Sequence, residues 1–165
     1  MEADLTSHHI EGLAIHGNTP FSCPLISYVG QFGEGTLHQG GCFDGVEVDF
    51  DVIVSLYNRE RFRFDGHTFI EAKMYDASGE VPTGQVLWLA EQVAMFLDQG
   101  QRVLVHCQAG LNRSSLVVGA YLIRHAGMTG AEAITAIRKR SDACLCNPDF
   151  ELWIRSLGRP DAPAT

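Results

Sequence analysis

A cysteine and an arginine lie six positions apart in the segment 106–115, which reads HCQAGLNRSS. A cysteine thiolate is a strong nucleophile, and a guanidinium group binds two phosphate oxygens through its planar fork. Cys107 is therefore a candidate nucleophile. Arg113 is a candidate ligand for a phosphate group and for the transition state of its transfer. These residue types at this spacing predict chemistry on a phosphate ester.

The segment lies between a predicted strand and a predicted helix. Residues 102–105 form a short apolar run, and residues 116–123 are apolar on nearly every helical face. A loop that closes onto a helix N-terminus points several backbone N–H groups into one concavity, where the helix dipole adds positive potential. The residues expected to bind phosphate are Gln108, Ala109, Gly110, Leu111, Asn112 and Arg113. The same positive field favours the thiolate form of Cys107.

Three neighbours have predicted supporting roles. Ser114 can donate its hydroxyl to the Cys107 sulfur, which makes the sulfur a better leaving group when a phosphocysteine is hydrolysed. His106 is expected to fix the loop through hydrogen bonds, and Gly110 to relieve crowding within it. The competing interpretation is that Cys107 is only a buried cysteine beside a helix cap.

The segment resembles the signature of the cysteine-dependent protein phosphatases, in which His-Cys is followed by five residues, an arginine and a serine or threonine. Within them it is most similar to the dual-specificity branch. The resemblance implies a general acid on a loop about thirty residues upstream, because the leaving oxygen needs a proton. Asp76 lies on such a loop, before a helix predicted to begin near Pro82, and Glu80 is the alternative acid. An aspartate in a turn also commonly serves only to hydrogen-bond the backbone.

A third match lies at residues 145–150, which read LCNPDF and resemble the Asn-x-x-Phe stretch of the same family. Asn147 is predicted to cap the helix that follows it. The resemblance implies that this asparagine also helps to brace the catalytic loop. The similarity covers roughly residues 25 to 157 and weakens towards the N-terminus.

Alternating apolar segments predict the fold. Strands are expected at 26–31, 51–56, 68–74 and 102–106, and helices at 85–99, 113–125, 130–141 and 149–157. This order predicts a single α/β domain, similar to the dual-specificity phosphatases, with a mainly parallel central sheet flanked by helices on both faces. Ligands of such sheets bind beyond the carboxyl ends of the strands, where Cys107 falls. We expect a catalytic domain at 25–157, an N-terminal segment at 1–24 that is extended or packed on it, and a flexible tail at 158–165.

The negative charge is confined to one part of the chain. Residues 1–58 contain eight acidic residues and no lysine or arginine, and the rest of the chain is neutral. An acidic surface disfavours nonspecific binding to nucleic acid or to anionic membranes. The segment 59–64, RERFRF, is the exception. It predicts either a basic rim that contacts groups beside the target phosphate, or an edge hairpin with its phenylalanines turned inward.

The chain has five cysteines. This odd number, together with the expected absence of a signal peptide and of a membrane-spanning run, favours a reducing, cytoplasmic location. Cys144 and Cys146 lack a second pair at metal-site spacing, so we expect no metal and no cofactor. Cys23 or Cys42 is a candidate partner for an oxidised Cys107, although the sequence does not show proximity.

The predicted function is hydrolysis of phosphate monoesters through a phosphocysteine intermediate, with phosphorylated protein tyrosine, serine or threonine as substrate. Two alternatives remain open. The stretch from Gly110 to Arg113 also resembles the Gly-x-Asn-Arg of RNA 5′-phosphatases in the same superfamily. The chain can also be a non-catalytic pseudophosphatase module that only binds phosphate. An inositol-lipid substrate is less favoured. Inositol-lipid phosphatases of this superfamily typically have lysines in the loop, and this chain has none between Cys107 and Arg113.

Overall fold

The central sheet of the computed structural model has six strands in the order β1-β2-β3-β6-β4-β5. The structure describes residues 10–16, 19–41, 49–58 and 68–160. The strands are β1 (Ile10–His16), β2 (Thr19–Phe32), β3 (Gly35–Gly40), β4 (Val52–Tyr57), β5 (Thr68–Met74) and β6 (Arg102–His106). The helices are α1 (Thr83–Asp98), α2 (Arg113–Arg124), α3 (Gly130–Arg138) and α4 (Pro148–Ser156).

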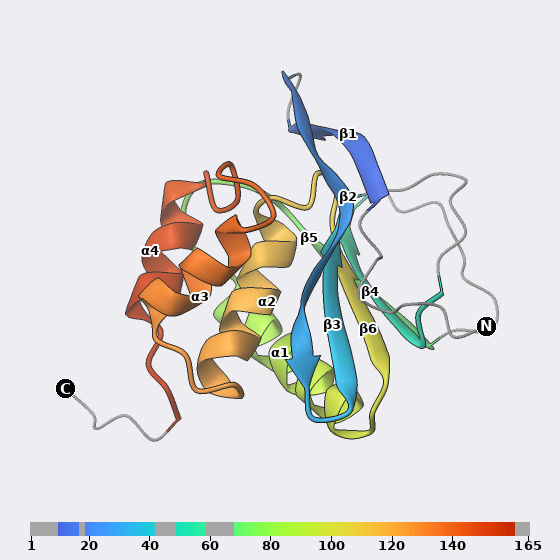
Figure 1. Cartoon of the computed structure of the whole chain (residues 1–165). Helices are drawn as coiled ribbons and strands as arrows, with labels where there is room; N and C mark the ends of the chain where they lie inside the picture. Colours follow the sequence, from blue (N-terminus) through green and yellow to red (C-terminus); the bar gives the residue numbers. More distant parts are fainter. Residues whose placement is uncertain (1–9, 17–18, 42–48, 59–67, 161–165) are drawn as a thin grey trace.

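Strands β3, β6, β4 and β5 are parallel, and β1 and β2 add an antiparallel extension at one edge. The prediction of an α/β domain with a mainly parallel sheet is confirmed. The carboxyl ends of parallel strands lie at the same end of a sheet. The loops that follow β5 and β6, which carry Asp76 and Cys107, therefore leave from the same end (Figure 1).

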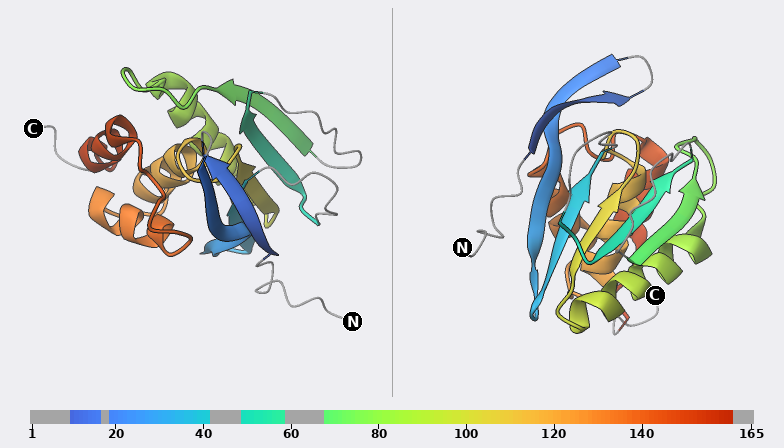
Figure 2. Two further views of the ribbon diagram at one scale, coloured as in Figure 1. Left: turned by 90° about the horizontal axis from the view of Figure 1, so that it is seen from above. Right: turned by 90° about the vertical axis from the view of Figure 1, so that its right-hand side faces the viewer.

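The expectation of helices on both faces of the sheet is wrong for the described part of the chain. Its four helices all lie on one face (Figures 1 and 2), and neighbouring helices pack on each other. The order of the elements explains this. Helix α1 connects two parallel strands, β5 and β6, but α2, α3 and α4 follow the last strand. They have no further strand to reach; α2 packs on α1, and α3 and α4 pack on α2 and on each other.

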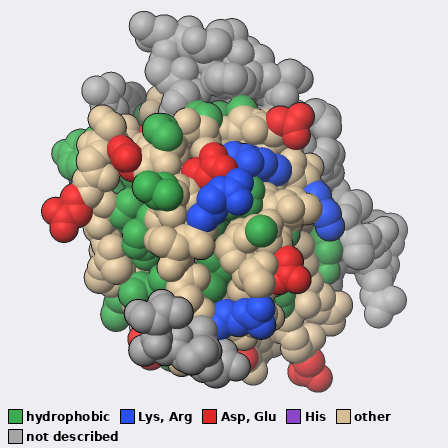
Figure 3. Space-filling model, turned by 90° about the vertical axis from the view of Figure 1, so that its left-hand side faces the viewer, with side chains coloured by type: hydrophobic (Ala, Val, Ile, Leu, Met, Phe, Trp, Pro, Cys, Tyr) green, Lys and Arg blue, Asp and Glu red, His purple; other side chains and the backbone are tan. Residues whose placement is uncertain are grey.

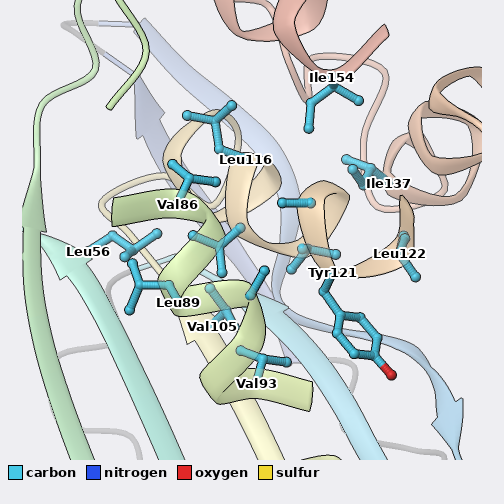
Figure 4. Close-up of a cluster of buried hydrophobic side chains, with 14 of the residues drawn as sticks. Leu56, Val86, Leu89, Val93, Val105, Leu116, Tyr121, Leu122, Ile137 and Ile154 are labelled. Carbon is cyan, nitrogen blue, oxygen red and sulfur yellow. The ribbon is translucent and has the colours of Figure 1, made fainter. Parts of the chain in front are cut away.

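The main core lies between the sheet and these helices (Figure 4). Alternation along β6 directs Val103 and Val105 to this core. Helix α2 is buried from Arg113 through Ile123, as its apolar sequence predicts for a central helix. Burial on all sides holds the first turn of α2, and with it the loop before it, in a fixed position.

Element boundaries show where the sequence signal is weak. Strand β3 and strand β1 were absent from the prediction, and β2 begins at Thr19 rather than at residue 26. Helix α3 ends three residues earlier than predicted, at Arg138. Within the described residues, no helix is long and apolar enough to span a lipid bilayer.

Candidate active site

The loop between β6 and α2 has its carbonyl groups held on one side. The Gly110 carbonyl accepts from Gln39 Nε2 at 3.1 Å and from Arg140 Nε at 2.9 Å. The Leu111 carbonyl accepts from the Leu145 backbone N–H at 2.9 Å and from Ser115 Oγ at 2.7 Å. In a trans peptide the C=O and the next N–H point in opposite directions. The N–H groups after these carbonyls therefore face into the loop.

These inward N–H groups form a candidate anion-binding site. Among the described residues, no protein acceptor takes a hydrogen bond from the backbone N–H groups of residues 108–113. The first turn of α2 adds the positive end of its dipole. A concavity of unpaired N–H groups at a helix N-terminus fits a phosphate group.

Gly110 is required at its position in this loop. Its φ is +69°, in the left-handed region. A Cβ there would lie 2.5 Å from Arg140 Nη2 and 2.7 Å from the Gly40 carbonyl carbon. The prediction that this glycine relieves crowding is confirmed, because both the backbone conformation and the space exclude a side chain.

Cys107 lies at the start of the loop and is 2% exposed. Its backbone N–H donates to the Gly40 carbonyl at 3.2 Å, which fixes the cysteine to the end of β3. Its Sγ lies within hydrogen-bonding distance of Ser114 Oγ, at 3.5 Å. The contact that the sequence predicts between these two side chains is therefore present.

Arg113 is 6% exposed, and two of its guanidinium nitrogens donate hydrogen bonds. Nη1 donates to the Met74 carbonyl at 3.2 Å, and Nη2 donates to Gln108 Oε1 at 3.5 Å. Nε is buried without a hydrogen-bond partner in the described chain. A buried donor on a charged group is costly to leave unpaired, so Nε is available for a bound anion.

Asp76 is partly buried, and each oxygen of its carboxylate accepts a hydrogen bond from an asparagine amide. Asn112 Nδ2 donates to Oδ2 at 2.8 Å, and Asn147 Nδ2 donates to Oδ1 at 2.9 Å. Asp76 is therefore joined to Asn112 of the loop between β6 and α2. Glu80, the alternative acid, is exposed.

Asn147 connects helix α4 to both loops. Its Oδ1 accepts from the backbone N–H groups of Asp149 at 3.1 Å and Phe150 at 3.4 Å, which confirms the predicted N-cap. Its own backbone N–H donates to Asn112 Oδ1 at 3.1 Å. Asn147 thus caps helix α4 and forms hydrogen bonds with both Asn112 and Asp76.

Two residues at this site were absent from the sequence prediction, Gln39 and Arg140. Both are buried and both donate to the Gly110 carbonyl. Gln39 lies 71 residues before Gly110 and Arg140 lies 30 residues after it, so spacing does not reveal either contact. The sequence offers no signal for Gln39, because periodicity does not predict the strand that carries it.

His106 and the remaining cysteines have different surroundings. His106 is buried at the end of β6, where its backbone pairs with Gly40 and Ser55; its role in fixing the loop stays a prediction. Cys144 is buried 3.8 Å from the Gly110 carbonyl, and Cys146 is exposed 3.4 Å from Asn112 Nδ2. The side chain of Cys23, Cys42 and the segment 59–64 lie outside what the structure describes.

Together these groups can perform phosphoryl transfer. A thiol faces a loop of unpaired N–H groups, an arginine has a free buried N–H, and a carboxylate is fixed on the adjacent loop. Such a site can supply a nucleophile, electrostatic stabilisation and a proton donor or acceptor.

The comparisons with known proteins agree with this chemistry. The family model described as "Dual specificity phosphatase, catalytic domain" matches residues 43–159. A MAP kinase phosphatase with leucine-rich repeats from Dictyostelium discoideum is 32% identical over 79 residues, which cover 46% of this chain and 9% of that protein. Putative tyrosine phosphatase 123R of Invertebrate iridescent virus 6 is 34% identical over 67 residues, which cover 36% of this chain and 47% of the viral protein.

The matched segments thus span less than half the length of these two relatives. Among solved structures, human DUSP28 is similar with a TM-score of 0.63 and 19% identity. That similarity covers 78% of this chain and 90% of DUSP28, and it supports the fold.

Proposed function

The chain belongs to the dual specificity phosphatase catalytic-domain family, and on that premise we propose that it is a cysteine-dependent phosphatase of phosphorylated proteins. Its substrates are phosphate monoesters of tyrosine, serine or threonine side chains. The enzyme acts through a phosphocysteine formed at Cys107. The donors around this cysteine support the activity most directly, because the inward N–H groups and the buried Arg113 Nε have no acceptor among the described residues and can donate to a phosphate.

In the first step the Cys107 thiolate attacks phosphorus, and an S–P bond forms as the P–O bond of the ester breaks. Arg113 and the loop N–H groups stabilise the charge on the phosphoryl oxygens. Asp76 gives its proton to the leaving oxygen. The guanidinium group is positioned for this role because Arg113 Nη1 donates to the Met74 carbonyl.

In the second step a water molecule attacks phosphorus, and the Asp76 carboxylate takes its proton. The S–P bond breaks, and its electron pair returns to the Cys107 sulfur. Ser114 stabilises this thiolate through its hydroxyl, which lies 3.5 Å away. Inorganic phosphate leaves, and the enzyme returns to its starting state with Asp76 protonated.

Charge favours a protein substrate over the 5′ end of an RNA. The chain carries a net charge of −8. On the helical face shown in Figure 3, basic side chains are interspersed with acidic and hydrophobic ones. Proteins that bind nucleic acid commonly present a continuous basic surface. The thiolate nucleophile also needs reducing conditions, so we propose a cytoplasmic location.

The test is turnover of para-nitrophenyl phosphate, with EDTA and a reductant present, by the parent protein and by Cys107→Ser. We expect activity in the parent and none in the variant. Thermal shift on addition of vanadate gives the matched control, because Cys107→Ser should still bind the anion through Arg113 and the loop.

A panel of phosphopeptides and 5′-triphosphate RNA then identifies the substrate class. Faster turnover of the RNA would contradict the protein assignment. A folded parent that binds phosphopeptides without hydrolysing them would support the non-catalytic alternative.

A further inference from the structure

Gln39 lies behind the phosphate-binding loop and is 1% exposed. Its side-chain nitrogen contacts three acceptors: Gly110 O at 3.1 Å, Ser114 Oγ at 3.1 Å and Ser115 Oγ at 2.8 Å. A backbone carbonyl accepts hydrogen bonds and cannot donate them. The Gln39 side-chain atom 3.1 Å from the Gly110 carbonyl is therefore its NH2 nitrogen, because an amide oxygen there would face a second acceptor.

This orientation determines where the serine protons go. Ser115 gives its proton to the Leu111 carbonyl at 2.7 Å, so it accepts from Gln39. The amide has two hydrogens, so its second N–H is shared between the Gly110 carbonyl, to which Arg140 also donates, and Ser114 Oγ. Ser114 thus accepts from Gln39 and keeps its own proton for the Cys107 sulfur at 3.5 Å. When the sulfur is a thiolate it has no proton, so the hydrogen bond must run from Ser114 to sulfur.

We propose that Gln39 is a positioning residue for hydrolysis of the phosphocysteine. It holds the Ser114 hydroxyl with its proton directed at the sulfur that departs when the S–P bond breaks. No proton moves from Ser114; its O–H stabilises the returning electron pair as a hydrogen bond. The inference rests on the proposed phosphatase function and assigns Gln39 to its second step.

The remaining contacts separate this role from a general structural one. Without Gln39, the Gly110 carbonyl still accepts from Arg140 Nε at 2.9 Å. The Leu111 carbonyl still accepts from the Leu145 N–H at 2.9 Å. The loop N–H groups and Arg113 therefore stay in place for the first step. The first step also consumes the thiolate, so it gains little from a bond that stabilises the thiolate.

The test compares Gln39→Met, which keeps the side-chain length but has no donor, with the parent in rapid-mixing experiments on an aryl phosphate. One neutral hydrogen bond predicts a fall in kcat of roughly tenfold, with kcat/KM within about threefold of the parent. A burst of about one phenolate per enzyme should precede the slow phase, because phosphocysteine accumulates. Leu37→Met, on the same strand and the same side of the sheet, is the matched control and should behave as the parent.

A double variant shows whether Gln39 acts through Ser114. Ser114→Ala should produce the same burst, and adding Gln39→Met to it should slow hydrolysis no further. A double variant whose loss of hydrolysis is the product of the two single losses would overturn the positioning role. Equal losses in kcat and kcat/KM in Gln39→Met would also overturn it. If Gln39→Met does not fold, Gln39→Asn, whose shorter amide does not reach Ser114, is expected to show the same burst.

The two proposals fail in different ways. An active parent with an inactive Cys107→Ser, together with parent-like hydrolysis in folded Gln39→Met, overturns the role of Gln39 alone. A folded parent without turnover overturns the phosphatase function and the Gln39 inference with it.

Discussion

Asn112 donates from Nδ2 to Asp76 Oδ2 at 2.8 Å. The bond joins a residue of the phosphate-binding loop, which is 2% exposed, to the proposed general acid on the loop after β5. Asn112 also accepts from the Asn147 backbone at 3.1 Å, so its amide plane is fixed from both sides. The loop proposed to bind the phosphate thus also positions the proposed general acid.

Asn112→Ala should impair proton transfer more than phosphate binding. Two asparagine amides donate to Asp76, one from Asn112 and one from Asn147. The variant removes the Asn112 bond, so the carboxyl group of Asp76 loses its fixed position. We expect a loss of kcat of about tenfold or more on a phosphoserine peptide, whose leaving group needs a proton, and a smaller loss on para-nitrophenyl phosphate. Steady-state kinetics on the two substrates measure this. Equal losses on both would contradict the positioning of Asp76 by Asn112.

Asp76→Asn removes the proposed acid itself. We expect kcat to fall by roughly 10² to 10⁴ on a phosphoserine peptide and by less on an activated aryl phosphate, because the latter leaves without a proton. Thermal unfolding checks that the variant is folded. An unchanged rate on the peptide would exclude Asp76, and Glu80→Gln, on the same loop, would then be the variant to measure.

Gly110→Ala should reduce both stability and anion binding. A non-glycine residue at a positive φ costs about 1 to 3 kcal/mol, and the new Cβ meets Arg140 and the Gly40 backbone. We expect a lower Tm and a smaller vanadate-induced shift. Gly84→Ala, in α1, is the control and should not lower Tm, because a Cβ at that position would meet nothing within 4 Å. A Gly110→Ala protein with parent-like Tm and anion binding would contradict the crowding at this position.

The capping box of α3 predicts a pH-dependent stability. Hydrogen bonds from the backbone and side chain of Thr129 lower the pKa of Glu132. A glutamate whose folded pKa is below its unfolded value stabilises the protein above the unfolded pKa, and this contribution is lost as pH falls through the folded pKa. Glu132→Gln should therefore lower Tm at neutral pH and have little effect in acid.

Thr129→Ala is the control for this prediction. Its hydroxyl does not titrate, so we expect Tm to fall by about 2 to 4 °C both at neutral pH and in acid. Measurement of Tm by circular dichroism from neutral to acidic pH compares the two variants. A Glu132→Gln deficit that persists unchanged in acid would contradict the assigned role of the carboxylate charge.

The sequence predicts the position of the loop between β6 and α2 well because the signal is local. Cys107, Arg113 and Ser114 lie within eight residues, and their chemistry follows from type and spacing. Helix α2 and strand β6 have continuous apolar runs that only a buried element explains. Asn147 carries a capping signal in its own helix, which the structure confirms.

Other parts depend on contacts between distant segments. Strand β3 reads GTLHQG and has one large apolar residue, so periodicity does not predict it. It is nevertheless fully buried because it lies between β2 and β6. The placement of all four described helices on one face likewise depends on how the strands order in space. Gln39 and Arg140 reach the Gly110 carbonyl only because the fold brings these distant segments together.

Direct detection of the phosphorylated cysteine tests the central claim most sharply. The parent protein is mixed with an aryl phosphate, quenched in acid within the first turnover, digested and analysed by mass spectrometry. The proposed mechanism predicts that the peptide containing Cys107 gains the mass of one HPO3 group and that this peptide is unmodified in Cys107→Ser. Turnover by the parent with the phosphoryl group on another residue, or with no phosphoenzyme in Ser114→Ala, where it should accumulate, would contradict the mechanism.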